Sequence, residues 1–251
     1  MYTMDLNADL GESFGAYNIG QDSELLQWIT SANIACGLHA GDPIVMERTV
    51  GLAQQRGIAI GAHPGFPDLQ GFGRRNMVLA PMEVKAFLLY QIGALAAFVR
   101  SAGATLHHVK PHGALYTMAT RDRNLAKAIA EAVSVFDPNL SLMALAGSQM
   151  VEEGHALGIS IIKEAFADRG YDKEGNLIPR SQPGAIIRDP QVVAVRAVQM
   201  VRFGFVQAVT GEQVPLSFQS LCIHGDNPNA CAIAQAVHQA MVEEGIVLQA
   251  V

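Results

Sequence analysis

The chain has 251 residues, and half of them are apolar, which is enough for the core of one large α/β domain. Its formal net charge is −6 at pH 7 and no stretch gathers Lys or Arg, so it lacks the basic surface of a nucleic-acid-binding protein. Neither a linker nor a shift in composition divides the sequence, and we therefore expect a single domain over residues 1–251.

The N-terminal sequence, MYTMDLNADLGE, lacks the basic and apolar regions of a signal peptide. Cys36, Cys222 and Cys231 form an odd number at unrelated spacings, which favours reduced thiols over a disulfide framework. The longest apolar stretch, residues 86–99, is shorter than the roughly 20 residues that span a bilayer. These features predict a cytoplasmic protein with no membrane partner, in which this stretch is a buried helix.

Short apolar runs alternate with longer helical stretches along the chain. Several runs are rich in Ile, Val, Leu and Ala on both faces, as expected of parallel strands that are covered by helices. The predicted strands are residues 4–8, 33–36, 58–61, 105–109, 140–144, 160–162 and 221–223, with a last run at 246–248 that closes or flanks the sheet.

Residues typical of helix termini lie between these strands. An Asp or Asn directly before Pro predicts helix starts at Asp42-Pro43, Asp189-Pro190 and Asn227-Pro228. Further predicted N-caps are Asp22, Asp122 and Ser148, and the predicted helix ends are Gly57, Gly103 and Gly158.

Seven or eight repeats of a strand followed by a helix predict a parallel sheet with right-handed crossovers. Polar residues follow almost every predicted strand. In a barrel these residues would meet at one mouth, so a closed or nearly closed barrel fits the sequence better than an open sheet.

The first predicted strand carries polar side chains at every second position, Asp5, Asn7 and Asp9, which places them on one face. Such alternation is ordinary in a strand at the exposed edge of a sheet. Here the pattern runs on towards Glu12, and the other predicted strands read as buried. Carboxylates inside a barrel are costly unless they are paired or bind a cation, so we interpret this face as functional.

Histidines beside Gly follow four of the predicted strands. They are His39 after the second strand, His63 after the third, His112 after the fourth and His224 after the last. A single His in such a place is more often a hydrogen-bonded turn residue than a catalyst, but four of them predict one common pocket at the barrel mouth. The remaining histidines are expected to support Lys110 (His107 and His108) or to lie at the surface (His155 and His238).

Two kinds of chemistry fit these residues. Asp and His side chains from successive strands can hold a divalent cation, and the expected ligands would be Asp9, His39 and His63. No HExxH sequence or cysteine cluster supports a metal, and the same side chains can act as acids, bases and oxyanion donors without one. Lys110, at the end of the fourth strand, would stabilise negative charge, have a lowered pKa, or pair with a neighbouring carboxylate.

Two long loops carry arginines. Arg74 and Arg75 follow the third strand, and Arg169 and Arg180 flank a second loop that contains several glycines. Arg suits a carboxylate or phosphate through paired hydrogen bonds, although solvated loop charge explains any one of them equally well. Neither a Walker A sequence nor GxGxxG occurs, so the sequence shows no recognisable nucleotide site of its own.

Several of these segments are long, ordered motifs. They are NADLGESFG (7–15), NIACGLHAGDP (33–43), GAHPGFPDLQGFGRR (61–75), VKPHGALY (109–116), EAFADRGY (164–171), LIPRSQPGA (177–185) and CIHGDNPNA (222–230). In these motifs, which extend over essentially the whole chain, the sequence resembles the LamB/YcsF family. The resemblance implies a (β/α)₇-type TIM-like barrel of the glycoside hydrolase/deacetylase superfamily.

The resemblance also implies an activity. Members of the family are the A component of bacterial 5-oxoprolinase, which opens 5-oxo-L-proline to L-glutamate and hydrolyses ATP to ADP and phosphate. They are expected to work with two further subunits, B and C, which are related to the two parts of allophanate hydrolase and would supply the ATP. The resemblance does not decide whether the chain binds a divalent metal or forms a homo-oligomer.

The reaction that the resemblance implies gives each candidate residue an expected role. The expected catalytic residues are Asp9, His63, Lys110, His112, Glu164, Asp168 and His224. Asp9 or His63 would act as the base and a later histidine as the acid, while Lys110 stabilises developing charge. The expected substrate-binding residues are Asn7, Glu12, Arg74, Arg75 and Arg169.

Two other functions fit the same residue pattern. A stand-alone metal-dependent deacetylase would act on an N-acetylated sugar or a small amide, and tightly bound zinc or manganese would favour it. A non-catalytic component would only hold substrate for its partners. Binding of 5-oxoproline that survives the loss of Lys110 and His112, without effect on turnover, would favour that second function.

Overall fold

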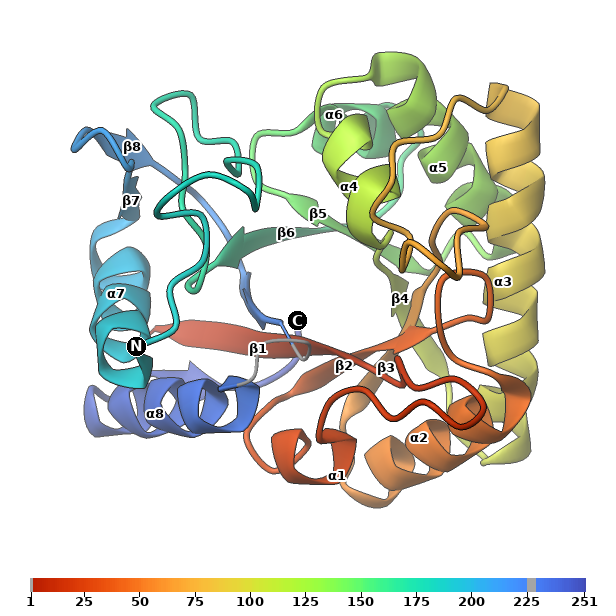
Figure 1. The fold of residues 1–251 in the computed structure, drawn as a ribbon, viewed down its shortest axis with the longest axis horizontal. Coiled ribbons are helices and arrows are strands. Elements are labelled where there is room, and N and C mark those ends of the chain that lie inside the picture. Colours follow the sequence, from red (N-terminus) through yellow and green to blue (C-terminus); the bar gives the residue numbers. More distant parts are fainter. Residues whose placement is uncertain (1, 225–228) are drawn as a thin grey trace.

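Seven parallel strands close into a barrel in the computed structural model, which describes residues 2–224 and 229–251 (Figure 1). In order around the barrel they are β1 (Thr3–Leu10), β2 (Ser31–Ala35), β3 (Ala59–His63), β4 (Leu106–Val109), β5 (Ser141–Leu145), β6 (Ile161–Phe166) and β9 (Ser220–Ile223). β9 pairs with both β6 and β1, which closes the ring. The predicted parallel barrel is confirmed, and the last predicted run is β10 (Val247–Leu248), which flanks the start of β1.

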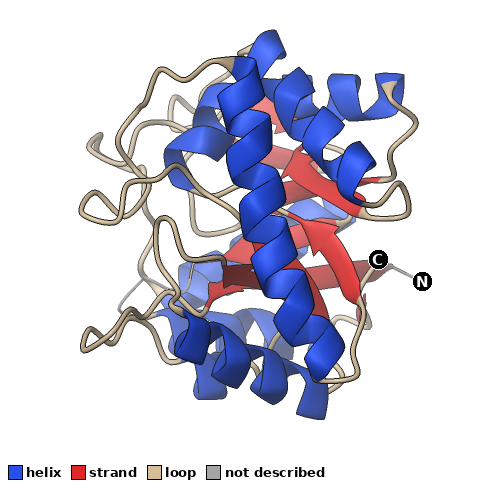
Figure 2. Cartoon of the chain, turned by 90° about the vertical axis from the view of Figure 1, so that its right-hand side faces the viewer, coloured by secondary structure: helices blue, strands red, loops and turns tan. Residues whose placement is uncertain are grey.

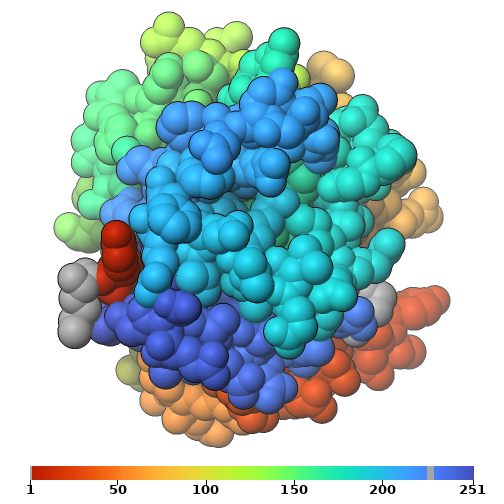
Figure 3. All heavy atoms as spheres, turned by 90° about the vertical axis from the view of Figure 1, so that its left-hand side faces the viewer, coloured from red at the N-terminus to blue at the C-terminus, as the bar shows by residue number. Residues whose placement is uncertain are grey.

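The described residues form eight helices, which surround the barrel (Figure 2). They are α1 (Asp22–Leu25), α2 (Pro43–Gln55), α3 (Pro81–Ser101), α4 (Gly113–Ala119), α5 (Arg123–Phe136), α6 (Gln149–Ala156), α7 (Pro190–Phe203) and α8 (Ala230–Glu243). The C-terminal third of the chain, in cyan and blue, covers one side of the molecule (Figure 3). Helices therefore shield the outer, apolar faces of the parallel strands.

A small antiparallel hairpin, β7 (Phe205–Gln207) and β8 (Gln213–Pro215), has no counterpart among the predicted strands. Each of its strands has only three residues and is partly exposed. Such short runs carry neither the buried pattern of a barrel strand nor a long alternation, so periodicity gives no signal for them. The hairpin lies outside the barrel, between α7 and β9 (Figure 1).

Most of the predicted helix termini are confirmed. Asp42, Asp122 and Asp189 precede α2, α5 and α7, and each carboxylate accepts hydrogen bonds from two backbone N–H groups of the first turn. Gly57, Gly103 and Gly158 follow α2, α3 and α6, with left-handed φ values between 68° and 72°. A residue without Cβ adopts this conformation at little cost, which is why the helices end there.

Two predicted caps differ from the structure. Asp22 is the first residue of α1 rather than its cap, and its carboxylate instead accepts hydrogen bonds from the Gly11 N–H and the Thr49 hydroxyl. Ser148 stands at the cap position of α6, but its hydroxyl makes no capping hydrogen bond. The Asn227-Pro228 pair lies outside the described residues.

The apolar stretch 86–99 belongs to α3, which is 21 residues long. By length and composition alone α3 could cross a membrane, and it is the one such helix in the described part of the chain. One face of α3 is buried, including Leu88, Ile92 and Leu95, while Met82 and Tyr90 are exposed. The prediction of a buried helix therefore holds for one face only, as in an amphipathic helix on a barrel wall.

Polar side chains fill much of the barrel interior. Asp5, near the start of β1, accepts hydrogen bonds from the hydroxyls of Thr30, Ser31 and Ser220. Burial raises the pKa of Asp5 above its ordinary value, and these hydroxyls oppose that effect only in part. Asp5 is thus satisfied within the fold and lies one layer below Asn7 and Asp9 along the strand.

Gly61 on β3 gives one interior side chain the space that it needs. A Cβ atom at this position would lie 2.1 Å from Nε2 of His108, on the neighbouring strand β4. The imidazole of His108 is therefore accommodated inside the barrel because Gly61 has no side chain. From there Nε2 of His108 lies 2.7 Å from Oδ1 of Asn33.

Candidate active site

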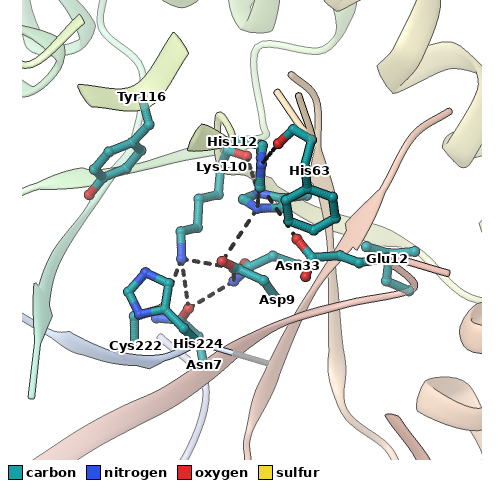
Figure 4. A network of polar contacts seen from close by, with 12 residues as sticks. Asn7, Asp9, Glu12, Asn33, His63, Lys110, His112, Tyr116, Cys222 and His224 are labelled. Atoms are coloured by element: carbon teal, nitrogen blue, oxygen red, sulfur yellow. Dashed lines mark hydrogen bonds and ion pairs between the residues drawn. The ribbon is translucent and has the colours of Figure 1, made fainter. Parts of the chain in front are cut away.

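The C-terminal ends of the strands place most of the predicted residues at one mouth of the barrel. Asn7 and Asp9 come from β1, His63 from the end of β3 and Glu164 from β6. Lys110, His112, Asp168 and His224 lie within three residues after the strands that precede them. All eight are buried, and Figure 4 shows six of them converging with Glu12 and Cys222. These strand-end side chains therefore gather at one mouth of the barrel, and their roles stay a prediction.

The ammonium of Lys110 lies at the centre of this pocket (Figure 4). Its Nζ is 2.8 Å from Oε1 of Glu164 and 3.0 Å from Oδ1 of Asp9. It also donates to Oδ1 of Asn7 at 3.2 Å and lies 3.1 Å from Sγ of Cys222. A buried cation between two carboxylates is the arrangement that makes charges tolerable inside a protein.

The surroundings of Lys110 fix its charge. Burial by itself lowers the pKa of Lys110, but Asp9, Cys222 and Glu164 more than offset burial and hold the pKa well above its ordinary value. Burial raises the pKa of Asp9, yet His63 and Lys110 outweigh it and leave that pKa well below the ordinary range. Near neutral pH we therefore expect Lys110 to be a cation beside an anionic Asp9, and the raised pKa disagrees with the lowered Lys pKa that the sequence allowed.

Glu164 is held by three neighbouring side chains. The hydroxyl of Tyr116 donates to Oε2 at 2.8 Å, and the amide of Asn7 donates to Oε1 at 2.9 Å. With Lys110 these bonds use both oxygens of the carboxylate. Glu164 is completely buried and contacts Lys110, so its position suits orienting that ammonium.

Two histidines face each other beside this charged centre. Nδ1 of His112 lies 3.0 Å from Nε2 of His63, and the opposite nitrogens face backbone carbonyls, of Phe72 at 2.8 Å and Lys110 at 2.7 Å. Oδ2 of Asp9 is 3.4 Å from Nε2 of His63, and Oε1 of Glu12 is 3.5 Å from Nδ1 of His112. Two carboxylates thus flank a pair of imidazoles.

His39 completes this cluster. Its ring stacks on that of His112 with the centroids 3.8 Å apart and an angle of 5° between the planes. The residue is fully buried, and neither ring nitrogen has a hydrogen-bond partner among the described residues. Burial is the main reason that the pKa of His39 lies well below its ordinary value, with His63 adding to the effect. His39 is therefore a neutral imidazole.

A second acid–base pair lies on the other side of Lys110. Nδ1 of His224 is 3.1 Å from both carboxylate oxygens of Asp168, and Asp168 is buried while the His224 side chain is 11% exposed. Burial raises the pKa of Asp168, but His224 outweighs it, so the pKa lies below the ordinary value. An ionised Asp168 orients the ring of His224, whose other nitrogen makes no hydrogen bond to the described residues.

The predicted substrate-binding arginines, Arg75, Arg169 and Arg74, differ in their contacts and exposure. Arg75 pairs with Asp68 and its side chain is about two-thirds exposed, so it stabilises its own loop and we leave it out of the site. Arg169 is buried and donates hydrogen bonds to the carbonyl oxygens of Ala185 and Ile178, so it holds in place the loop that follows β6. Arg74 lies over the Phe72 ring, near the histidine cluster. The Phe72 ring in turn lies 5.2 Å from the ring of His112, measured between centroids, which places Arg74 beside the mouth.

The other histidines agree with their expected positions except one. His108 is buried beneath the pocket, and His107 bridges Nδ1 of His108 and the backbone oxygen of Val251. His155 is exposed on α6. His238 is half-buried on α8, where its ring packs edge-on against Trp28, so the expectation of a surface residue is wrong for it.

Three residues of the pocket were not predicted as site residues: Asn33, Tyr116 and Cys222. Asn33 donates to Asn7 and Asp9 at 2.8 and 2.9 Å. Strand alternation gives a signal for Cys222, because it stands two residues before His224 on the same face. Tyr116 lies on α4, and only the tertiary fold brings its hydroxyl to the barrel interior.

The structure regroups the predicted metal ligands. Among the described residues, two sets offer ligand atoms within 4.8 Å of one another: Glu12, His39, His63 and His112 in one, and Asp9, Cys222 and His224 in the other. The predicted triad thus falls into two parts, with Asp9 separate from His39 and His63. The strand order was right for all three, but which side chains turn towards one another is decided by the loops.

Comparisons with known proteins agree with this architecture. The model of the LamB/YcsF family matches residues 4–251. A relative from Alkaliphilus metalliredigens, named as the A component of 5-oxoprolinase, is 54% identical over 98% of this chain and 96% of its own. A relative of the same name from Pyrococcus furiosus is 50% identical over 97% of this chain and 95% of its own.

Solved structures show the same fold. The crystal structure of the lactam utilization protein from Thermus thermophilus has a TM-score of 0.95 and 51% identity, and it covers 99% of this chain and 100% of its own. A putative cellobiose-phosphate cleavage protein from Enterococcus faecalis shares the fold alone, with a TM-score of 0.53 and 14% identity over 98% of this chain and 96% of its own. Because the family model and relatives at about half identity both span nearly the whole length, the chain belongs to the LamB/YcsF family.

Proposed function

We propose that this chain is the A component of an ATP-dependent 5-oxoprolinase, which opens 5-oxo-L-proline to L-glutamate and hydrolyses ATP to ADP and phosphate. The observation that carries the proposal is the 50–54% identity, over nearly full length, to relatives named as this component of 5-oxoprolinase. The residues at the barrel mouth support it, because they supply the charges and proton carriers that opening a lactam requires.

Opening the ring makes specific chemical demands. Water adds to the carbonyl carbon, negative charge develops on the oxygen, and the nitrogen gains a proton as the C–N bond breaks. Lys110 is a buried cation beside the place where this charge would develop. A fixed charge in a site that excludes water stabilises such a transition state without reorganisation, and losing one donor typically costs about 10²–10³ in turnover.

The proton carriers lie on the two sides of Lys110. His224, held by Asp168 and partly exposed, is placed to give the nitrogen its proton. The pair of His63 and Asp9 is placed to receive the proton of the attacking water. Asp9 alone would be a weak base, because its pKa lies well below the ordinary value. We therefore assign Asp9 the role of balancing charge beside His63.

ATP and the partner subunits complete the proposal. A five-membered lactam is a stable amide, and transfer of the γ-phosphoryl group of ATP to its carbonyl oxygen releases ADP and makes the ring carbon more electrophilic. Water then adds, the C–N bond breaks to leave an acyl phosphate, and a second water molecule releases glutamate and inorganic phosphate. The sequence has no Walker A motif, so subunits B and C would deliver the ATP. Arg74, beside the histidine cluster, is placed to bind the substrate carboxylate or the phosphate. The proposal includes a cytoplasmic location, in keeping with the three free cysteines.

The test is glutamate release from 5-oxoproline and ATP, measured with this chain alone and with subunits B and C. The complete complex is expected to release glutamate, and the chain alone is not. Asp168→Asn and Lys110→Met are each expected to lower the turnover of the complex by about 10²-fold or more. His155→Ala, at an exposed helix position, is the matched control and should leave turnover unchanged.

Three outcomes would count against the proposal. The first is a complete complex that releases no glutamate, and the second is unchanged turnover in both Asp168→Asn and Lys110→Met. The third is release of acetate from N-acetylated sugars by the chain alone, which would favour a stand-alone deacetylase instead.

A further inference from the structure

We propose that Glu12, His39, His63 and His112 form a binding site for one divalent transition-metal ion of the first row, such as Zn²⁺, Mn²⁺ or Co²⁺. This ligand set differs from the triad that the sequence predicts, because it includes Glu12 and His112 and leaves Asp9 outside. Ligand atoms of all four residues lie within 4.8 Å of one another, and all four residues are buried.

The protonation of two histidines supports a bound cation. A backbone carbonyl can only accept a hydrogen bond, so His63 must carry a proton on Nδ1, which faces the Lys110 carbonyl. For the same reason His112 must carry a proton on Nε2, which faces the carbonyl of Phe72. The two remaining nitrogens face each other at 3.0 Å, and their lone pairs would repel unless a shared proton or a metal cation lies beside them.

These carbonyl contacts are also the usual setting of a metal-binding histidine. A His that ligates a metal generally donates its other ring N–H to a carbonyl or carboxylate, which fixes the tautomer and the orientation of the ring. His63 and His112 both do so through backbone carbonyls, at 2.7 and 2.8 Å. The main chain thus presents both lone pairs to the same point.

The spacing of the two nitrogens fits one ion. Metal–nitrogen bonds are about 2.0–2.1 Å long, so two nitrogens 3.0 Å apart subtend an angle of about 90° at a shared ion. Such an angle suits five or six ligands better than a tetrahedral set. First-row divalent ions accept this geometry with imidazole and carboxylate ligands.

His39 provides independent support. Its ring is fully buried and neither nitrogen has a hydrogen-bond partner among the described residues, although a buried polar atom is normally paired. Two glycines hold it in place, because a Cβ at Gly65 would lie 2.7 Å from its Nδ1 and one at Gly73 would lie 2.8 Å from its Cβ. A bound ion would provide the partner that His39 lacks, and Glu12 would contribute negative charge.

The ion would lie at the barrel mouth, on the side of Lys110 away from His224 (Figure 4). A divalent ion in this position makes a bound water molecule more acidic, which is the chemistry that it would supply to a hydrolase. The 5-oxoprolinase assignment does not depend on this ion, but the role of His63 does: an ion on Nε2 would leave no nitrogen of His63 to accept the proton of the attacking water, because Nδ1 already donates to the Lys110 carbonyl. A chain that releases glutamate with its partners but binds no metal would overturn this site and leave that function standing.

The test is direct metal binding by the complete chain. The protein is stripped with a chelator, dialysed and titrated with Co²⁺, while visible absorption and calorimetry report binding. One Co²⁺ is expected per chain, with absorption bands typical of nitrogen and oxygen ligands. His39→Ala and His112→Ala should each weaken binding by more than the roughly 10–100-fold that loss of an outer-shell partner costs.

Three further variants make the result decisive. Glu12→Gln keeps the shape of the side chain and is expected to weaken Co²⁺ binding by about tenfold or more, so it decides the matter if the His variants fail to fold. Asp9→Asn should weaken binding by no more than the roughly 10–100-fold that loss of an outer-shell partner costs, because Asp9 lies outside the ligand set although its Oδ2 is 3.4 Å from Nε2 of His63. His155→Ala is the matched control. Absence of Co²⁺ binding by the unmutated chain would overturn the site and leave a proton shared between His63 and His112. Equal binding by the His39, His112 and Glu12 variants would overturn it as well.

Discussion

Replacing Lys110 with Met removes the ammonium that pairs with Asp9 and Glu164 inside the barrel while filling most of its volume. Both carboxylates are then left buried without this partner. Breaking a buried ion pair from one side typically costs about 3–5 kcal/mol. For a domain of this size, that loss corresponds to a fall in the unfolding temperature of roughly 6–20 °C near neutral pH.

The loss should shrink as the pH falls. Asp9 has a folded pKa well below its ordinary value, so its stabilising contribution is present above about pH 4 and is lost as the pH falls through the folded pKa. Without Lys110 the pKa of Asp9 rises towards the value that burial favours, although His63 and His224 still oppose that rise. The variant then binds a proton when it folds, so its deficit relative to the unmutated chain should be smaller at about pH 5 than at about pH 7.5.

Thermal unfolding followed by circular dichroism at both pH values measures this difference. Lys127→Met, at an exposed position of α5, is the matched control and should change stability by no more than about 0.5 kcal/mol. A loss of less than about 1 kcal/mol for Lys110→Met near neutral pH would refute the reasoning. A deficit that is equal at both pH values would refute the part assigned to Asp9.

Further predictions concern single positions. Gly61→Ala should destabilise the chain by about 1–3 kcal/mol in urea unfolding, because the added Cβ would overlap the imidazole of His108 on β4. The control is Gly51→Ala on α2, where the added Cβ meets no atom, and it should stabilise the chain by about 0.5–1 kcal/mol. Cys222 should react with a thiol reagent far more slowly than the partly exposed Cys231, because burial raises the pKa of the Cys222 thiol well above the ordinary value. A time course followed by mass spectrometry measures both rates, and comparable rates would contradict this prediction. Asp189→Ala should cost about 1 kcal/mol in thermal unfolding through loss of the α7 cap, and an unchanged midpoint would contradict that assignment.

The barrel could be predicted because its signals are local. Parallel strands that are buried on both faces are short apolar runs, and Asp-Pro pairs and glycines mark the helices between them. The β7–β8 hairpin escaped prediction because three partly exposed residues carry no such signal. Asp22 resembled a cap in sequence, but its carboxylate bonds to Gly11 and Thr49, which are distant in the chain.

The sequence predicted which residues gather in the candidate site better than it predicted which of them pair with one another. Residues 5, 7 and 9 share a face because a strand alternates, and the titratable groups after β3, β4, β6 and β9 meet because parallel strands end at the same mouth. Arg75 carries a guanidinium that could bind a ligand, yet the carboxylate of Asp68 on the same loop pairs with it. No local pattern distinguishes an arginine that binds a loop from one that binds a substrate.

The sequence by itself indicated seven or eight parallel strands, the family, and most of the polar side chains that gather at the mouth, because periodicity and strand polarity are properties of neighbouring residues. The tertiary structure alone decided that Lys110 lies between Asp9 and Glu164, and that His63 and His112 turn their lone pairs towards each other. These contacts join residues 49 to 101 positions apart, so their geometry depends on the loops and on the closure of the barrel.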